Sequence, residues 1–192
     1  MKNIHKTAFL SVVLLCIAAA FLVQFHLKKN YKERYISNGE VYHEQEKTSY
    51  DPNSGLEYAI GEDESGETYI MTCGYQGNDK IVVIPEYIQD ISVKYIGEMS
   101  FLYQDEIERI ELPDSITKIC NFSFGSCSQL KEISIPSSVQ EIEDYAILTN
   151  DNETKSMKDI TIITEKGSEA AEYAKKKKLK IKYVGNDMAC EQ

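Results

Sequence analysis

The stretches ELPDSITKI (111–119) and SIPSSVQEI (134–142) repeat one pattern of apolar residues around a proline. Pro113 and Pro136 occupy equivalent places in the two stretches. The shift that superimposes these prolines also pairs six apolar positions: Ile107 with Leu130, Ile110 with Ile133, Leu112 with Ile135, Ile116 with Val139, Ile119 with Ile142, and Phe124 with Ile147. Agreement at all these positions indicates an internal repeat.

Two further copies flank this pair. The stretch IVVIPEYIQDISVKYIGEMSF (81–101) has Val82, Ile84 and Pro85 in equivalent places. On the other side, Met157, Ile160 and Ile162 are the expected equivalents of Leu130, Ile133 and Ile135, after a slightly longer spacing. A period of 20–30 residues is typical of a solenoid, in which each coil buries its apolar face against the next. The sequence therefore predicts about four stacked coils, with Ile110, Ile133 and Ile160 in consecutive rungs.

Within each copy, the residues before the proline read as a strand. In LKEISIP (130–136), Ile133 and Ile135 lie on one face and Glu132 and Ser134 on the other, as the period of a strand requires. Pro136 ends the strand because it lacks the N–H that a ladder needs.

The copies resemble the BspA-type leucine-rich-repeat family of cell-surface proteins, whose unit is similar to L-x-x-I-x-I-P-x-x-V-x-x-I-x-x-x-A-F-x-x-C. The units here read IERIELPDSITKICNFSFGSCSQ (107–129) and LKEISIPSSVQEIEDYAI (130–147), and the resemblance covers about residues 56–184. The departures are Ser100 and Ser123 for Ala, Cys120 and Glu143 for Gly, and Ile147 for Phe. The resemblance implies a mainly β fold with short helical pieces, a right-handed leucine-rich-repeat solenoid of about four short coils.

Two outward positions of each strand line up across the predicted sheet. One row is Ile81, Arg109, Glu132 and Asp159, and the other is Val83, Glu111, Ser134 and Thr161. Because leucine-rich-repeat proteins commonly bind with this face, the resemblance implies that these eight residues contact a partner. Four strands ~4.8 Å apart give a patch of only ~300 Å², below the ~800 Å² per partner of a standard interface. We therefore expect weak binding unless flanking loops or many copies contribute.

Both ends of the solenoid, which spans residues 81–163, are expected to be capped. Residues 56–80 predict an N-terminal hairpin around the acidic turn GEDESGE (61–67), which lacks the ligand spacing of a calcium loop. Residues 164–184 predict a C-terminal capping helix and strand. Ser168 is the expected N-cap of that helix, with acidic residues in its first turn and Lys175–Lys178 in its last. Residues 185–192 are expected to be a disordered tail.

Residues 1–29 predict a membrane segment. As a helix, the apolar run from Ala8 to Phe25 rises about 27 Å, enough to cross a bilayer with some thinning. An uncleaved transmembrane anchor is favoured because Lys28 and Lys29 close the run. A cleaved signal peptide ending near Ala18–Ala20 stays open. Residues 30–55 read as a polar stalk.

Composition excludes several function classes. The net charge is −10, and the acidic residues all follow residue 29, so the body repels phosphate backbones and nucleic-acid binding is not expected. The last of three histidines is His43, and the five cysteines show no C-x-x-C. With no nucleophile–base pair, metal cluster or phosphate loop, we expect no catalysis, no metal and no cofactor.

These observations predict a non-enzymatic cell-surface module that binds or adheres to a protein or glycan. It is expected to be membrane-anchored through residues 8–25 with the repeats extracellular, or secreted after cleavage. Charge alone does not fix this orientation, which follows from the family resemblance. The alternative is a structural or accessory subunit that packs on a membrane complex of its own cell.

Overall fold

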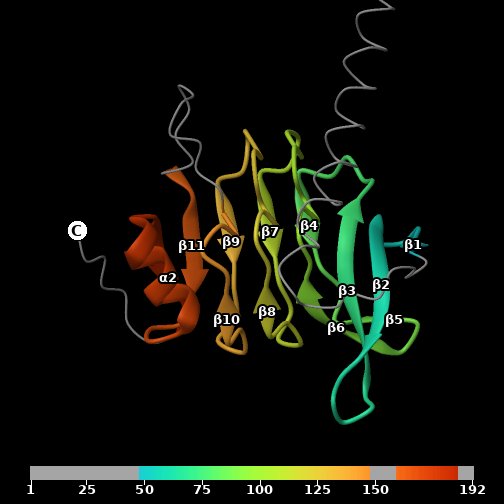
Figure 1. Ribbon diagram of the computed structural model, residues 1–192. Helices are drawn as coiled ribbons and strands as arrows, with labels where there is room; N and C mark the ends of the chain where they lie inside the picture. Colours follow the sequence, from blue (N-terminus) through green and yellow to red (C-terminus); the bar gives the residue numbers. More distant parts are fainter. Residues whose placement is uncertain (1–47, 148–158, 186–192) are drawn as a thin grey trace, which may run out of the picture. The chain divides into compact units, whose positions relative to one another are not determined.

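The structure, a computed structural model, describes residues 48–147 and 159–185, which all fall in one compact unit, Glu46–Gln192. Two sheets make up this unit (Figure 1). Sheet B has the order β12-β11-β9-β7-β4, with the bounds β4 Ile81–Val83, β7 Arg109–Glu111, β9 Glu132–Ser134, β11 Thr161–Thr164 and β12 Lys180–Tyr183. Sheet A has the order β1-β2-β3-β6-β8-β10, with the bounds β1 Ser49–Asp51, β2 Leu56–Glu62, β3 Thr68–Tyr75, β6 Ile91–Ile96, β8 Lys118–Ile119 and β10 Glu141–Ile142. A short strand, β5 (Tyr87–Ile88), pairs with β6.

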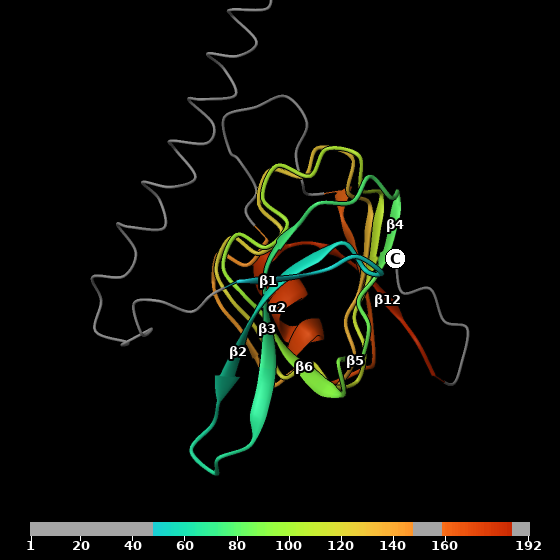
Figure 2. The ribbon, with the colours of Figure 1, turned by 90° about the vertical axis from the view of Figure 1, so that its right-hand side faces the viewer.

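The coils stack in register, which confirms the predicted solenoid. All neighbouring strands of sheet B are parallel, and Val82, Ile110 and Ile133 are direct partners across it. In sheet A, Ile96, Ile119 and Ile142 form the second rung. Viewed along the stack, the coils superimpose as one ring (Figure 2). Each coil therefore supplies the apolar interior that its neighbours need.

The register of the fourth coil differs from the prediction. Ile162, not Ile160, is the partner of Ile133, so the predicted alignment of this coil is wrong by two positions. Both isoleucines are buried. Because side chains two positions apart share a face of a strand, the apolar pattern alone could not distinguish two registers that differ by two.

The corners of the first two coils each carry an aromatic residue and a buried hydroxyl. Phe101 and Phe124 stack with centroids 5.6 Å apart. The Ser123 hydroxyl lies 3.1 Å from the carbonyl oxygen of Gly97, and the Ser100 hydroxyl donates to that carbonyl at 2.7 Å. The two serines that depart from the family pattern thus have their hydrogen bonds satisfied inside the core, as buried polar groups require.

The N-terminal end is capped by strands. β2 and β3 form an antiparallel hairpin, and β3 continues sheet A by pairing in parallel with β6. Tyr75 packs on Phe101, with their ring centroids 5.6 Å apart, and so extends the aromatic stack into the cap. β1 pairs with β2, although its residues lie within the stretch predicted to be stalk.

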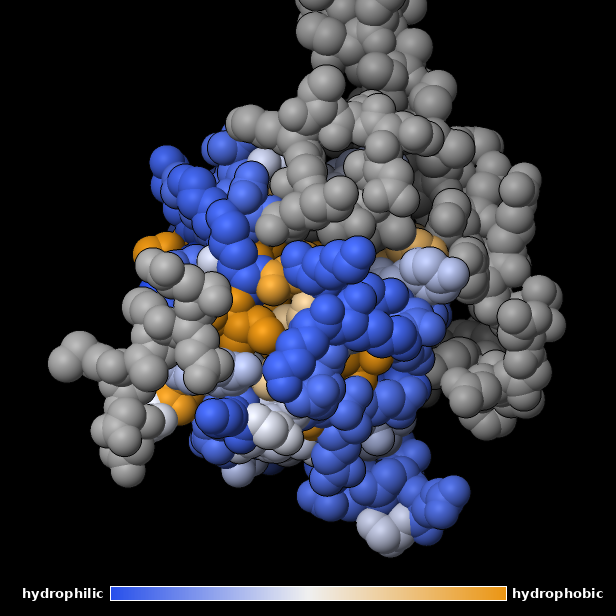
Figure 3. All heavy atoms as spheres, turned by 90° about the vertical axis from the view of Figure 1, so that its left-hand side faces the viewer, coloured by the Kyte–Doolittle hydropathy of each residue, from blue (hydrophilic) through white to orange (hydrophobic). Residues whose placement is uncertain are grey.

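The C-terminal end is capped by a helix. α2 (Glu169–Lys177) begins after Ser168, whose side chain accepts the N–H of Ala171, as predicted. Ala170, Tyr173 and Ala174 are buried against the last coil. Hydrophilic residues cover much of the outer surface of this end, with apolar residues exposed between them (Figure 3). β12 then adds the last strand to sheet B.

The predicted anchor (1–29), the stalk up to residue 47 and the tail beyond Gly185 lie outside the described residues. Within the part of the chain that the structure covers, no helix has the length and apolar character needed to cross a membrane.

Candidate binding face

The outward rows of sheet B bring together six of the eight predicted contact residues as expected. Ile81, Arg109 and Glu132 are direct neighbours in one row. Val83, Glu111 and Ser134 are neighbours in the other. Because the strands are parallel and in register, these side chains form two straight lines across the sheet.

The fourth strand continues these rows with other residues than predicted. Thr161 pairs with Glu132 and so belongs to the first row, and Ile163 pairs with Ser134 and takes the place in the second row. Asp159 precedes β11 and lies in neither row. The cause is the same shift of two positions that moves Ile162 into the rung. β12 adds Lys180 and Lys182, which lie outside the repeat pattern, to the two rows.

The centre of the face is a charged group. Arg109 Nε lies 3.0 Å from Glu111 Oε1, and Arg109 Nη1 lies 3.4 Å from Glu132 Oε2. All three side chains are a little over one-third exposed. Partly solvated surface pairs of this kind contribute little to stability.

The two ends of the face differ in polarity. Ile81 and Val83 on β4 are 58% and 61% exposed, although both are apolar. At the other end, Lys180 is paired with Asp159 at 2.8 Å. The face therefore runs from an apolar edge through a charged centre to a basic edge.

A line of alternating charge flanks the face. Glu108 accepts from Lys80 at 2.9 Å and from Lys131 at 2.6 Å. These two lysines lower the pKa of Glu108 to about 2. The three residues each precede a strand of sheet B by one position in successive copies. The sequence contains this signal, because the three residues have equal places in the repeat and alternate in sign, but the apolar pattern that predicts the coils does not include them.

Sheet A carries a second charged group on its outer side. Lys118 lies 3.0 Å from Glu143 and 3.2 Å from Glu141. Glu143 also accepts the main-chain N–H of Asn121 at 2.7 Å. The glutamate that replaces the family's glycine thus stabilises the coil corner, and the group is structural.

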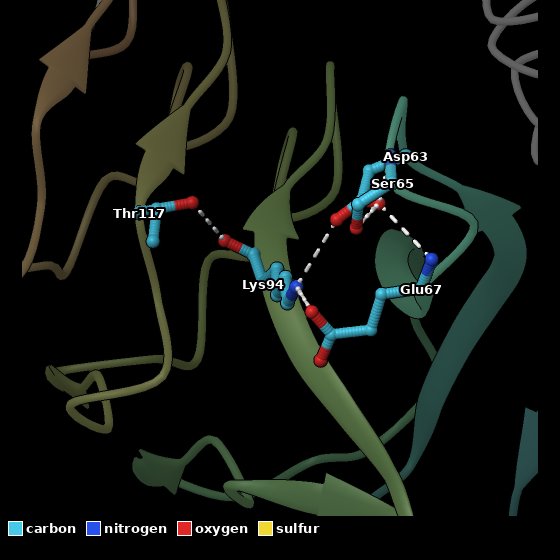
Figure 4. Close-up of polar contacts among 5 residues, drawn as sticks. All are labelled: Asp63, Ser65, Glu67, Lys94 and Thr117. Carbon is cyan, nitrogen blue, oxygen red and sulfur yellow. Dashed lines mark hydrogen bonds and ion pairs between the residues drawn. The ribbon is translucent and has the colours of Figure 1, made fainter.

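The acidic turn of the hairpin is tied to the first coil (Figure 4). Lys94 Nζ lies 2.9 Å from Glu67 and 3.4 Å from Asp63. Asp63 also accepts the main-chain N–H groups of Ser65 and Glu67, both at 3.0 Å. These contacts use the carboxylates to hold the turn, and across residues 48–147 and 159–185 no group of metal-binding side chains converges.

The buried thiols lack the surroundings of a nucleophile. Burial raises the pKa of Cys120 and of Cys127 to about 12. Cys127 Sγ lies 2.8 Å from the carbonyl oxygen of Phe101 inside the core. A reactive cysteine needs a lowered pKa and access to solvent, so these two thiols serve in packing.

Comparison with solved structures found partial similarities. They include a leucine-rich-repeat protein of T. pallidum (21% identity, TM-score 0.45, covering 62% of this chain and 55% of that one). Another is a leucine-rich cell-surface protein of Faecalibacterium prausnitzii (17% identity, TM-score 0.40, covering 73% of this chain and 31% of that one). A third is a leucine-rich-repeat protein of Bacteroides ovatus (17% identity, TM-score 0.35, covering 67% of this chain and 38% of that one). This chain thus spans between about a third and about half of their lengths. No curated protein sequence matches it significantly.

The repeat itself decides the family. The model of the BspA type leucine rich repeat region matches residues 80–182 in six copies, where the apolar pattern indicates about four coils. The matched residues begin next to the strand β4 and end within β12, so they include nearly the whole of sheet B. Since they make up more than half of the 192 residues, the protein belongs to the BspA type leucine rich repeat family.

Proposed function

We propose that the protein is a non-enzymatic cell-surface module that binds a protein or glycan partner through the outward face of sheet B. The observation that carries this proposal is the open face itself. Its two rows lie across five parallel strands, and most of their side chains are at least partly exposed. The membership of the chain in a repeat family also supports it, because stacked repeats create extended binding surfaces.

The size of the face sets the expected strength of binding. Five strands ~4.8 Å apart with two rows of side chains offer roughly 400 Å². This area is well below the ~800 Å² per partner of a stable complex. The module therefore binds weakly as a single copy, and tethering of many copies on one surface raises the avidity. The predicted anchor at residues 8–25 provides such tethering.

Binding is tested by reversing charge at the centre of the face. The full chain, carrying Glu111→Lys and Glu132→Lys together, is compared with the natural chain on arrays of glycans and of extracellular proteins. The matched control is Glu141→Lys, which reverses one exposed charge on sheet A. We expect the double variant to bind the ligands of the natural chain with at least tenfold lower affinity. The control is expected to bind them with unchanged affinity. Equal loss with both variants would contradict a role for sheet B.

The location is tested separately. Alkaline extraction of membranes is expected to leave the chain in the pellet, and protease added to intact cells is expected to degrade it. Protection from protease would indicate the opposite topology, with the repeats inside the cell, and would favour the structural subunit. Crosslinking in intact cells then distinguishes the alternative, since a structural subunit has one abundant neighbour in its own membrane.

A further inference from the structure

The edge strand β4 exposes main-chain groups as well as side chains. In a parallel ladder, alternate residues direct their N–H and C=O groups to the same neighbour. The Lys80 carbonyl accepts from Arg109 at 3.0 Å, and the Ile84 N–H donates to Glu111 at 2.9 Å, so the even-numbered residues face β7. The main-chain groups of Ile81 and Val83 therefore point to the free edge. No main-chain partner for them lies within residues 48–147 and 159–185.

The side chains at this edge are unusual for an unpaired strand. Natural proteins protect sheet edges with lysines or other charges, because unpaired edges recruit other chains. β12, the opposite edge of the same sheet, follows this rule with Lys180 and Lys182. β4 instead carries Ile81 and Val83, both more than half exposed. Among the residues that the structure describes, the edge of β4 thus combines unpaired main-chain groups with β-branched apolar side chains, the residue type that favours strand pairing.

The charge around this edge indicates the kind of chain that fits it. Residues 48–147 contain nineteen Asp and Glu but only five Lys and Arg, a net charge of −14. All five basic side chains already form ion pairs with carboxylates. Asp79 and Glu86 stand on either side of β4 in the sequence. The β4 edge of a second copy would bring a like charge to this edge, whereas a basic segment would bring the opposite one.

We propose that β4 accepts an extended, net-basic protein segment as an additional strand. The segment pairs with the main-chain groups of Ile81 and Val83, and its β-branched residues pack on these two side chains. Lysines or arginines at its ends approach Asp79 and Glu86. The stretch from Asp79 to Glu86 spans about 23 Å when extended, so a segment of about seven residues suffices. Because the contact is mainly with the backbone of the edge, it does not depend on binding by the outward face.

Peptides test this proposal directly. The probe is a fluorescein-labelled KTVTITK peptide, and its binding to the full chain in a mild nonionic detergent is followed by fluorescence anisotropy. N-methylation of alternate residues on one edge of the peptide removes the donors that pair with β4, whereas N-methylation on the other edge leaves them. We expect one of these two peptides to bind at least tenfold more weakly and the other to bind like the probe. The acidic peptide ETVTITE is also expected to bind at least tenfold more weakly than the probe.

Variants of the chain provide the second arm. Ile81→Lys places a charge at the edge and is expected to weaken binding at least tenfold. Tyr103→Lys, at an apolar residue that is also 58% exposed, is the matched control and is expected to change binding less than twofold. Saturating peptide is expected to slow hydrogen exchange at the amides of Ile81 and Val83, but not at that of Val82. Equal binding of both methylated peptides, or full binding by Ile81→Lys, would overturn the proposal. A dimer in light scattering that Ile81→Lys dissociates would do the same, because the occupant would then be a second copy.

Discussion

The two ends of the solenoid close the same interior with different elements. At the N-terminal end, the hairpin of β2 and β3 extends sheet A and leaves β4 as the edge of sheet B. At the C-terminal end, β12 extends sheet B, and α2 contacts β10 at the edge of sheet A. Each cap therefore lengthens one sheet only. The difference shows why the apolar edge Ile81–Val83 is open while the opposite edge of the same sheet carries lysines.

The strongest test of this comparison is between the middle of the stack and its end. Ile133 is fully buried in the rung between two complete coils, and we expect Ile133→Ala to lower the free energy of unfolding by about 4 kcal/mol. Ile181 ends the same rung on β12 and is only partly buried, so Ile181→Ala is expected to cost about 1 kcal/mol. Urea unfolding of the full chain measures both. Equal losses would mean that the last strand is packed as tightly as a central coil.

The sequence predicted the central coils well because each position is supported twice. Leu112 and Ile135, for example, occupy equivalent places in successive copies, and both are buried. The fourth coil offered only apolar residues at period two, which fit two registers equally. The prediction therefore placed Asp159 in the face and omitted Ile163, although Ile163 lies beside Ser134.

The ends were predictable only where local chemistry is specific. Ser168, the acidic first turn and the lysine-rich last turn of α2 interact within the helix, so they were readable without knowledge of the fold. β1 has the sequence SYD, which carries no strand signal, and it forms because β2 offers an edge. The apolar edge of β4 likewise depends on which sheet the cap extends, and no residue of the repeat specifies that choice.

The hydroxyl groups of two tyrosines provide the next test of the two caps. The Tyr173 hydroxyl accepts the main-chain N–H of the buried Ile147 at 3.1 Å. Tyr173→Phe leaves that donor without a partner, and we expect a loss of about 2 kcal/mol. At the other end, the Tyr75 hydroxyl donates to Asp79 at 2.8 Å, near solvent. Because water can replace this bond, Tyr75→Phe is expected to cost less than about 1 kcal/mol. If Tyr75→Phe lowers the free energy of urea unfolding more than Tyr173→Phe does, the hairpin cap depends more on its tyrosine hydroxyl than the helix cap does.

The N-cap of α2 is expected to have a smaller effect. Ser168 Oγ accepts the N–H of Ala171 at 3.2 Å and lies 2.8 Å from the Thr164 hydroxyl. Ser168→Ala is expected to lower the unfolding free energy by about 1 kcal/mol. Ser137→Ala, at an exposed turn residue, is the control and should stay within about 0.5 kcal/mol. If both variants unfold at the same urea concentration as the natural chain, the helix cap does not contribute to stability.

The carboxyl group of Asp63 in the hairpin turn is expected to have the smallest effect on stability, and its contribution can be measured at low pH. The Ser65 hydroxyl, then the N–H of Glu67, and to a lesser degree Lys94 lower the pKa of Asp63 from its usual 3.8 to about 2. A carboxyl group whose pKa is lower in the folded state stabilises that state above the unfolded pKa, so this contribution is complete above about pH 4 and is lost as the pH falls toward 2. NMR titration of the Asp63 carboxyl carbon should show a midpoint near 2 in the natural chain. Because the Ser65 hydroxyl has the largest influence, Ser65→Ala should raise this midpoint more than Lys94→Met does. The reverse order would mean that the ion pair with the first coil, and not the turn itself, holds the hairpin cap in place.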